Sequence, residues 1–323
     1  MKLVIHISRL LVAVAFIFSG FVKLVDPLGS SYKFTEYFSA DVLNLEFLIP
    51  YVLPISIVLI LSELMFGLLL LFGYLPKLTV WSLLGLILVF LFLTWYSAYF
   101  NKVTDCGCFG DALKLTPWTT FYKNLVLLLL ILILVFKQQT IRPIFNVSIV
   151  KWSIFLSFIL FLYITYYVLL HLPILDFRPY AVGTNISEGM EYVNGKEPPI
   201  HDFYLESKDG VDFTEKILQA ENVLLVVVYA VEKSEIQGFS KIKIVTNQAL
   251  KKGYTVYALS SSLIEDFEAV KRKFNLNFEV LFADEITLKT IIRANPGVVI
   301  LNKGTVKGKY NWVDVERVFN VKK

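Results

Sequence analysis

The sequence contains little cysteine and little histidine, and its charged residues are unevenly spread. It has two cysteines, Cys106 and Cys108, and three histidines in 323 residues. No cysteine lies in residues 176–323, which excludes a disulfide framework there. Residues 1–175 hold 11 Lys or Arg and 7 Asp or Glu, whereas residues 176–323 hold 20 of each. The second half is therefore neutral and lacks the basic surface that binds nucleic acid, so no nucleic-acid partner is expected.

Motifs of several enzyme classes are also missing. The sequence shows no Gly-rich phosphate loop, no Ser-His-Asp set with a locating motif and no internal repeat. The histidines, His6, His171 and His201, are scattered, whereas a structural zinc site needs four good ligands. The preferred prediction is therefore no metal site.

Long apolar runs fill the first half instead. A bilayer core needs about 20 apolar residues per helix, and five stretches qualify. Runs such as 125–136 are apolar on every helical face, whereas a helix of a soluble protein would show a polar stripe. The first stretch is too long for a signal-peptide core and lacks an A-x-A cleavage site, so we expect it to be retained. The predicted spans are 3–22, 51–72, 76–100, 118–136 and 149–170.

The charges between the spans predict an orientation. One side of the membrane carries basic residues without acids, and the other carries a mixture of both signs. The Lys and Arg counts of the two sides are almost equal, but the first-helix flank and the short basic loops favour a cytoplasmic N-terminus. Five spans in the inner (cytoplasmic) membrane would then place the C-terminal domain in the periplasm. The basic side holds Lys2, Lys77, Lys137, Arg142 and Lys151.

Both cysteines lie in one loop, between aromatic clusters that end the third span and begin the fourth. Such clusters mark a membrane interface. A C-x-C disulfide closes a small, strained ring, and strained disulfides exchange readily. Cys106 and Cys108 are therefore a candidate redox pair, with Asp105 and Asp111 modulating the thiols, although nearby carboxylates raise a thiol pKa. Two structural thiols in a packed loop, or a metal site with the aspartates, remain alternatives.

Two charges lie inside the predicted spans. Arg9 is in the first span and Glu63 near the middle of the second. Charges at such depth normally face the bundle interior and are paired. We expect an intramembrane ion pair between them, serving either as a proton or ligand site or as a link between two helices. Lys23, at the end of the first span, is interpreted as an anchor that reaches to the membrane surface.

Two stretches of the first half resemble known membrane families. The opening resembles the DoxX family, through Arg9-Leu10-Leu11, Phe18-Ser19-Gly20-Phe21-Val22-Lys23, Asp26-Pro27-Leu28-Gly29 and Ser62-Glu63-Leu64 with Gly67. The loop Asp105-Cys106-Gly107-Cys108-Phe109-Gly110-Asp111, followed by Pro117-Trp118, resembles the related MauE-like proteins. The likeness covers roughly residues 1–140. The fifth span and the soluble half resemble the longer DoxX proteins of the Bacteroidetes group.

The resemblance implies a four-helix membrane bundle with an extracytoplasmic cysteine loop. It also implies thiol–disulfide or quinone-linked redox chemistry, with a quinone as a possible cofactor, and a link to maturation of methylamine dehydrogenase. The lipid bilayer is the expected surrounding.

The second half alternates strands and helices. The apolar run 222–229 is typical of a strand buried on both faces. Further strands are predicted at 254–260 and 278–283, and a hairpin around Lys303-Gly304. This order resembles a thioredoxin-like fold, in which Pro296 is the cis-proline candidate. The redox motif of that family would fall near residues 230–235, which contain no cysteine, so this domain cannot itself exchange disulfides.

The predicted organisation has four parts. Residues 1–140 form the membrane bundle, 141–175 the fifth transmembrane helix, 176–215 a linker rich in glycine and proline, and 216–323 the thioredoxin-like domain. Two functions remain open: redox chemistry at the cysteine loop, or a non-enzymatic scaffold or maturation factor. In the second, an extracytoplasmic protein partner would dock on the soluble domain. A transport role centred on Arg9 and Glu63 ranks last, because so few spans leave little room for alternating repeats.

Overall fold

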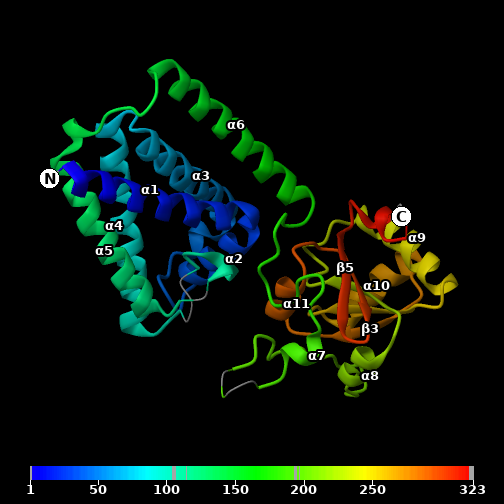
Figure 1. Ribbon diagram of the computed structural model, residues 1–323. Coiled ribbons are helices and arrows are strands. Elements are labelled where there is room, and N and C mark those ends of the chain that lie inside the picture. Colours follow the sequence, from blue (N-terminus) through cyan, green and yellow to red (C-terminus); the bar gives the residue numbers. More distant parts are fainter. Residues whose placement is uncertain (1, 104–106, 114, 193–194, 196, 320–323) are drawn as a thin grey trace. The chain divides into compact units, whose positions relative to one another are not determined.

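The computed structural model describes residues 2–103, 107–113, 115–192, 195 and 197–319. The chain divides into two compact units, Met1–Leu169 and Leu170–Lys323 (Figure 1). The first consists of helices, and the second contains a five-stranded sheet with helices around it.

Within the described residues, five helices are long and apolar enough to cross a membrane. They expose many large apolar side chains, and this exposure is unfavourable in water but favourable in lipid. The predicted spans are confirmed, and the chain is a multi-pass membrane protein. The helices are α1 (Lys2–Val25), α3 (Val52–Phe72), α4 (Pro76–Phe100), α5 (Pro117–Phe136) and α6 (Val147–Leu170).

Four of the five helices form a bundle. Helix α1 packs on α3 and α5, and α4 packs on α5 and α3. Leu83, Ile131 and Leu134 are fully enclosed at the centre of the bundle. Helix α6 is the least buried of the five, and it touches the bundle through Phe161 and Ile164. The four-plus-one arrangement is the one that the sequence predicted.

Short helices line the connections between the spans. The longest is α2 (Pro27–Phe38), which begins where the Asp26 carboxylate accepts a hydrogen bond from the Gly29 backbone amide and Pro27 takes the first helical position. The sequence pattern does not indicate this helix, because its apolar content is modest. The others are the 3-10 turns η1 (Glu46–Tyr51), η2 (Gly110–Ala112) and η3 (Gln138–Thr140).

Capping residues in the local sequence fix the start of α5 and the end of α3. Thr116 caps α5 by accepting a hydrogen bond from the Thr119 amide, and Pro117 is its first residue. Helix α3 ends at Gly73, whose φ of 70° is a left-handed conformation that suits glycine.

The second unit is a mixed sheet in the order β3-β2-β1-β4-β5. Strands β1, β2 and β3 are parallel, whereas β4 runs antiparallel to both β1 and β5. A parallel β-α-β unit followed by an antiparallel hairpin is the thioredoxin-like arrangement. The strands are β1 (Val223–Val228), β2 (Thr255–Ser260), β3 (Glu279–Phe282), β4 (Gly297–Asn302) and β5 (Thr305–Asn311).

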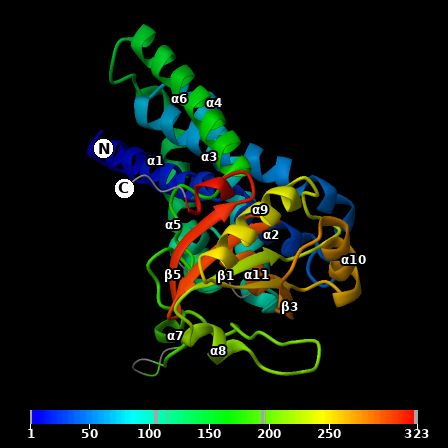
Figure 2. The ribbon, with the colours of Figure 1, turned by 90° about the vertical axis from the view of Figure 1, so that its right-hand side faces the viewer.

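The side chains of β1 alternate between the two faces of the sheet and contribute to a core on each face. Leu225 and Val227 face one core, and Leu224 and Val226 face the other. Helices α9 (Gly238–Lys251) and α10 (Ile264–Phe274) supply the second core, and α8 (Thr214–Gln219) and α11 (Glu285–Ile291) the first. The sheet thus lies between two layers of helices (Figure 1, Figure 2). The remaining elements are α7 (Ile186–Gly189) and the 3-10 turn η4 (Val315–Arg317).

The predicted linker at 176–215 is wrong. Tyr180, Ile186, Ile200, Phe203 and Leu205 from this segment are buried in the first core. Its backbone also pairs with the hairpin: the Gly183 amide donates to the Val306 carbonyl. Glycine and proline fit its turns, while its widely spaced apolar residues cover one face of the sheet.

A buried ionic cluster fixes the start of this segment to β5. The Asp176 carboxylate accepts hydrogen bonds from Lys309 Nζ at 2.6 Å and from Arg178 Nε at 2.7 Å. Burial lowers the pKa of Lys309 to about 7, and the charges of Arg178 and Arg293 add to the effect against the attraction of Asp176. The two cations hold the pKa of Asp176 below its usual value, against the effect of its burial. One carboxylate therefore pairs with two cations, and the pKa of Lys309 is lowered.

Candidate functional site

Of the predicted redox residues, Cys106 and Asp105 lie outside the described residues. Cys108 is half-buried in the loop between α4 and α5. Asp111 lies in the turn η2.

The intramembrane ion pair exists, but its cation is Lys23. Lys23 Nζ lies 2.7 Å from Glu63 Oε1 and 2.9 Å from Glu63 Oε2. The Glu63 side chain is fully buried and that of Lys23 is 7% exposed. The expected pairing of Glu63 with Arg9 is therefore wrong, and so is the interpretation of Lys23 as an anchor reaching to the membrane surface. The pair ties the last turn of α1 to the middle of α3.

Arg9 instead closes the opposite end of the bundle. Its guanidinium donates to the carbonyls of Leu70 at 2.8 Å, Leu71 at 2.7 Å and Arg142 at 3.2 Å. Leu70 and Leu71 are in the last turn of α3, where carbonyls lack helical partners and the helix dipole favours a cation. Arg9 thus satisfies the end of α3 and holds the connection between α5 and α6.

A third side chain joins the ion pair to the cysteine loop. Lys23 Nζ also donates to Ser19 Oγ at 2.8 Å, and Ser19 Oγ donates to the Cys108 carbonyl at 2.8 Å. A continuous chain of hydrogen bonds therefore runs from Glu63 through Lys23 and Ser19 to the backbone of Cys108. Ser19 and Lys23 are four residues apart, which places them on one face of α1.

Aromatic contacts hold the rest of the loop on the bundle. The Phe109 ring lies 5.4 Å from the Phe18 ring, and Lys123 Nζ lies 4.1 Å from the Phe109 centroid. A Cβ added at Gly107 would lie 3.0 Å from the stem of Lys33, and the φ of Gly107 is +64°. Glycine at this position lets the loop turn tightly against α2.

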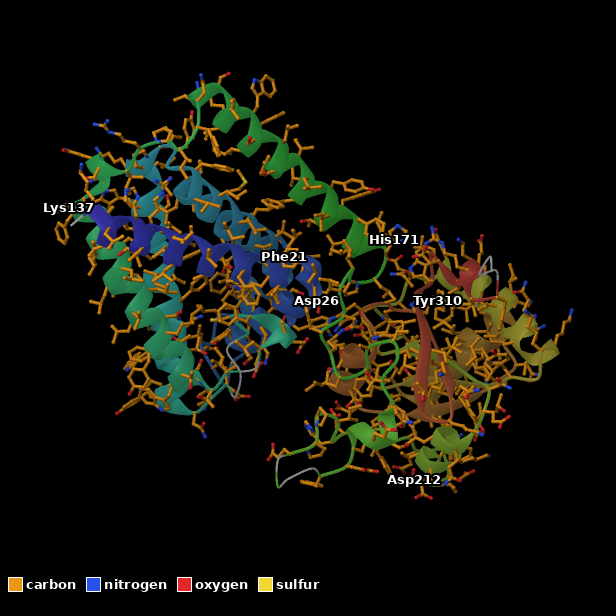
Figure 3. All side chains as sticks on the ribbon, viewed as in Figure 1. Phe21, Asp26, Lys137, His171, Asp212 and Tyr310 are labelled. Carbon is orange, nitrogen blue, oxygen red and sulfur yellow. The ribbon has the colours of Figure 1, made fainter. Side chains whose placement is uncertain are left out.

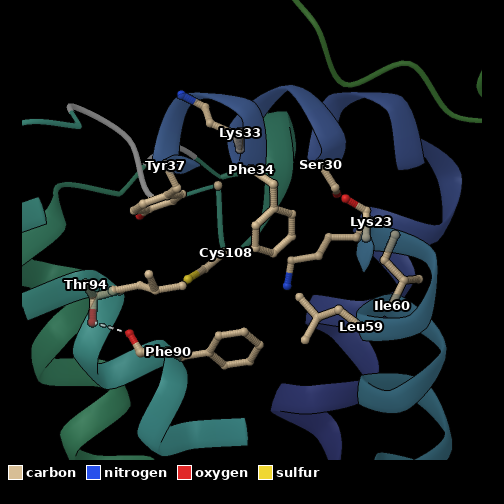
Figure 4. A pocket seen from close by; sticks show the side chains of 13 residues that line it. Lys23, Ser30, Lys33, Phe34, Tyr37, Leu59, Ile60, Phe90, Thr94 and Cys108 are labelled. Carbon is tan, nitrogen blue, oxygen red and sulfur yellow. Dashed lines mark hydrogen bonds between the residues drawn. The ribbon is translucent and has the colours of Figure 1, made fainter. Parts of the chain in front are cut away.

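Cys108 lies on the wall of a pocket at this end of the bundle. The pocket has about 490 Å³ of empty space, part of it open to the surroundings. Figure 4 shows Lys23 and Cys108 on the wall of the same pocket, together with the rings of Phe34 and Phe90. The described lining residues are Lys23, Ser30, Lys33, Phe34, Tyr37, Ser56, Leu59, Ile60, Phe90, Leu93, Thr94, Gly107 and Cys108.

The pocket has an apolar base and a polar rim. Leu59, Ile60 and Leu93 come from α3 and α4, inside the membrane span. Ser30, Lys33 and Tyr37 come from α2. Lys33 is partly exposed and pairs with Glu36 at 3.0 Å.

Lys23 is the cation deep in the pocket, and its Nζ lies 5.4 Å from the Phe90 centroid. Neither Glu63 nor Asp111 is among the described residues that line the pocket. The pair thus faces the pocket with its positive end.

The pocket and the role of Lys23 were missed by the sequence analysis. The signal was present, because Ser19 and Lys23 share a helix face and Glu63 needed a cation. Lys23 was set aside because it lies at a helix end, where lysines usually extend toward water.

In the second unit, the position of a thioredoxin motif is occupied by a closed, hydrogen-bonded loop. The Asn295–Pro296 peptide bond is cis, as the sequence suggested. Asn295 Nδ2 donates to the Ala230 carbonyl at 2.7 Å, and the Glu235 amide donates to the Asn295 carbonyl at 2.9 Å. A Cβ on Gly238 would lie 2.9 Å from Trp312 and 3.0 Å from Pro296. The loop after β1 is packed against the cis-proline, and it carries no thiol.

Comparisons with known proteins gave matches to parts of both halves. Residues 1–137 match the family described as methylamine utilisation protein MauE. A search of curated proteins found no match.

The second unit is similar to solved thiol–disulfide proteins. One is the thioredoxin domain of a thiol-disulfide oxidoreductase from Bacteroides vulgatus, with 15% identity over 33% of this chain and 81% of that chain, and a TM-score of 0.28. Another is a putative thiol:disulfide interchange protein DsbE from Chlorobium tepidum, with 19% identity over 34% and 80%, and a TM-score of 0.28. A third is a secreted disulfide oxidoreductase from Mycobacterium tuberculosis, with 17% identity over 32% and 80%, and a TM-score of 0.26. This chain thus joins a membrane region, in which residues 1–137 match the MauE family model, to a domain whose sheet has the thioredoxin-like strand arrangement.

Proposed function

We propose that the protein carries out thiol–disulfide exchange through Cys106 and Cys108 at the periplasmic surface of the inner membrane. The observation that carries this proposal is the position of Cys108, on the wall of a pocket beside a buried cation and fixed to it through Ser19. A thiol that merely filled space would need neither a pocket nor a charge at its side. Reactive cysteines occur in such partly exposed, electropositive surroundings.

The exchange balances without a further reagent. A thiolate of a partner protein attacks one sulfur of the Cys106–Cys108 disulfide, the bond between the two cysteines breaks, and its electron pair leaves on the other sulfur. A second thiolate of the partner then displaces the mixed disulfide. The partner gains a disulfide, and the two cysteines become thiols.

The pair must then be reoxidised, and the pocket lining suits a quinone as acceptor. Phe34, Phe90 and the aliphatic base offer an apolar slot for a flat lipophilic ring, and Lys23 offers a donor at its edge. A quinone bound there would supply an acceptor for the two electrons and two protons of the dithiol. The protein would contribute the slot, the donor and the fixed backbone of Cys108.

Thiol trapping in native membranes tests the proposal. After treatment with an oxidant or a reductant, alkylation of intact membranes should show the pair moving between disulfide and dithiol. The variant Cys106→Ser/Cys108→Ser should lose the function of the protein in cells, while Ser62→Ala, on the exposed side of α3, should keep it. A pair that stays reduced under every condition, together with a fully active double variant, would contradict the proposal.

The thioredoxin-like domain supports a second role, the docking of an extracytoplasmic protein partner. Its supporting observation is the loop between Ala230 and Glu235, which is hydrogen-bonded to Asn295 although no cysteine is present. A partner that co-purifies with the wild-type protein and equally with Cys106→Ser/Cys108→Ser would favour a scaffold or maturation factor. A partner lost with the cysteines would favour exchange.

A further inference from the structure

The Lys23–Glu63 pair is polarised toward the pocket. Lys23 lines the pocket, whereas Glu63 lies behind it, fully buried between α1 and α3. In surroundings of low dielectric, the nearer charge dominates the field felt by a pocket group. The pocket is therefore electropositive although the pair as a whole is neutral.

Glu63 and Ser19 hold the Lys23 ammonium in place. All three ammonium protons have acceptors: two are the Glu63 oxygens and the third is Ser19 Oγ. The carboxylate and the hydroxyl fix the position of the ammonium group, and the hydroxyl also links it to the Cys108 backbone.

We propose that Lys23 is a positioning residue whose ammonium stabilises the Cys108 sulfur as a thiolate. This inference rests on the proposed exchange and makes it asymmetric. When the disulfide opens, the incoming sulfur bonds to Cys106, and the electron pair leaves on Cys108, because the better-stabilised thiolate is the better leaving group. The reduced protein would then present Cys108 as the thiolate in the pocket.

Other charged groups near the pocket act more weakly. Lys33 and Glu36 are partly exposed and paired with each other, so solvent screens them. Lys123 rests on the Phe109 ring. Among the described residues, the titratable groups that line the pocket are Lys23, Lys33, Tyr37 and Cys108, and Glu63 and Glu36 are the partners of the two lysines.

A charge swap tests the inference while keeping the ion pair. In a Cys106→Ser background, Cys108 is the one remaining cysteine of the sequence. Its alkylation rate is measured against pH in the full-length protein, with and without Lys23→Glu/Glu63→Lys. The swap places a carboxylate toward the pocket, so the pH of half-maximal rate should rise by about one unit or more. Lys23→Arg alone, which retains the positive charge, should give a pH profile close to that of the protein without the swap.

Two further variants keep the test decisive. Lys23→Met/Glu63→Leu removes both charges and should also raise the midpoint, so it replaces the swap if the swapped protein does not fold. Lys33→Gln removes the screened pocket cation and should leave the midpoint unchanged. A midpoint that stays unchanged in the swapped or the apolar variant, or that moves only with Lys33→Gln, would overturn the role of Lys23. Thiol trapping of the wild-type pair answers a separate question, since the pair could cycle without help from Lys23.

Discussion

At the scale of single residues, Gly73 is a position where the membrane bundle requires glycine. Its φ is +70°, and a Cβ there would lie 2.3 Å from the Arg142 carbonyl oxygen and 2.7 Å from Arg9 Nη2. We expect Gly73→Ala to destabilise the membrane unit by more than the roughly 1 kcal/mol of the left-handed conformation alone. The cause is displacement of the backbone that Arg9 binds. Thermal unfolding of the protein in detergent would measure the loss.

Gly85 provides the matched control for Gly73. It lies within α4, and a Cβ there would meet nothing within 4 Å. Alanine is favoured over glycine inside a helix, so Gly85→Ala should be neutral or slightly stabilising. If both alanine variants unfold at the wild-type temperature, the tight turn at Gly73 is not the constraint that the structure indicates.

Side-chain direction explains why the buried charges were identified but wrongly paired. In a helix the side chains tilt toward the N-terminus. Lys23 therefore extends back along α1 to Ser19 and into the bundle, where it meets Glu63. Arg9 extends toward the opposite end, where the last carbonyls of α3 accept its protons. The expected pairing of Arg9 with Glu63 rested on their places within the spans and did not include this tilt.

At the scale of elements, the hydrogen bond from Ser19 to the Cys108 carbonyl fastens the cysteine loop to α1. Loss of one such bond costs about 1 kcal/mol, or roughly a fivefold change in an opening equilibrium. We expect Ser19→Ala to raise amide exchange in residues 107–110 by about that factor. Ser62→Ala is the control, because the Ser62 hydroxyl bonds to Val58 within its own helix. Equal exchange in the two variants would show that the loop is held by its aromatic contacts alone.

The cluster that joins the segment at 176 to β5 predicts a pH dependence. Lys309 has a pKa of about 7 in the folded chain, against about 10.4 when unfolded. Between these values the unfolded chain binds the additional proton, so stability should rise with pH from about 7 to 10. Tyr180 acts in the opposite sense only at higher pH, because burial raises its pKa. The expected rise is at most a few kcal/mol.

Urea denaturation of the full-length protein, read by proteolysis within residues 170–323, would measure this rise. Lys309→Met should remove it, because no buried ammonium remains to lose a proton. Lys307→Met, on the exposed side of the same strand, should keep it. A wild-type protein with flat stability across this range would refute the shift.

The elements show where sequence patterns inform and where they fail. The five spans follow from apolar length, and the strands of the sheet from runs such as 222–229. Helix α2 and the segment at 176–215 were not predicted, since both depend on contacts distant in sequence. Tyr180 and Phe203 are buried only because the sheet presents an apolar face to them. The pocket likewise requires α1, α2, α3, α4 and the cysteine loop together.

At the scale of the whole molecule, the number of spans sets the compartment of the chemistry. Five spans place the two ends of the membrane region on opposite sides of the bilayer, and the basic loops favour a cytoplasmic N-terminus. The cysteine loop follows the third span and the thioredoxin-like domain the fifth, so both would face the periplasm. Disulfides persist in that compartment, whereas the cytoplasm keeps thiols reduced.

Single cysteines introduced into Cys106→Ser/Cys108→Ser would test this topology in intact cells. Lys137→Cys lies at the exposed end of α5 (Figure 3), and Lys233→Cys lies on an exposed loop of the second unit. A membrane-impermeant maleimide should label Lys233→Cys in intact cells and Lys137→Cys only after lysis. The reverse pattern would place the cysteine loop in the reducing cytoplasm, where the strained disulfide would not persist. In that case the proposed thiol–disulfide exchange would be wrong. The scaffold role would be favoured, because docking a partner needs no oxidising compartment.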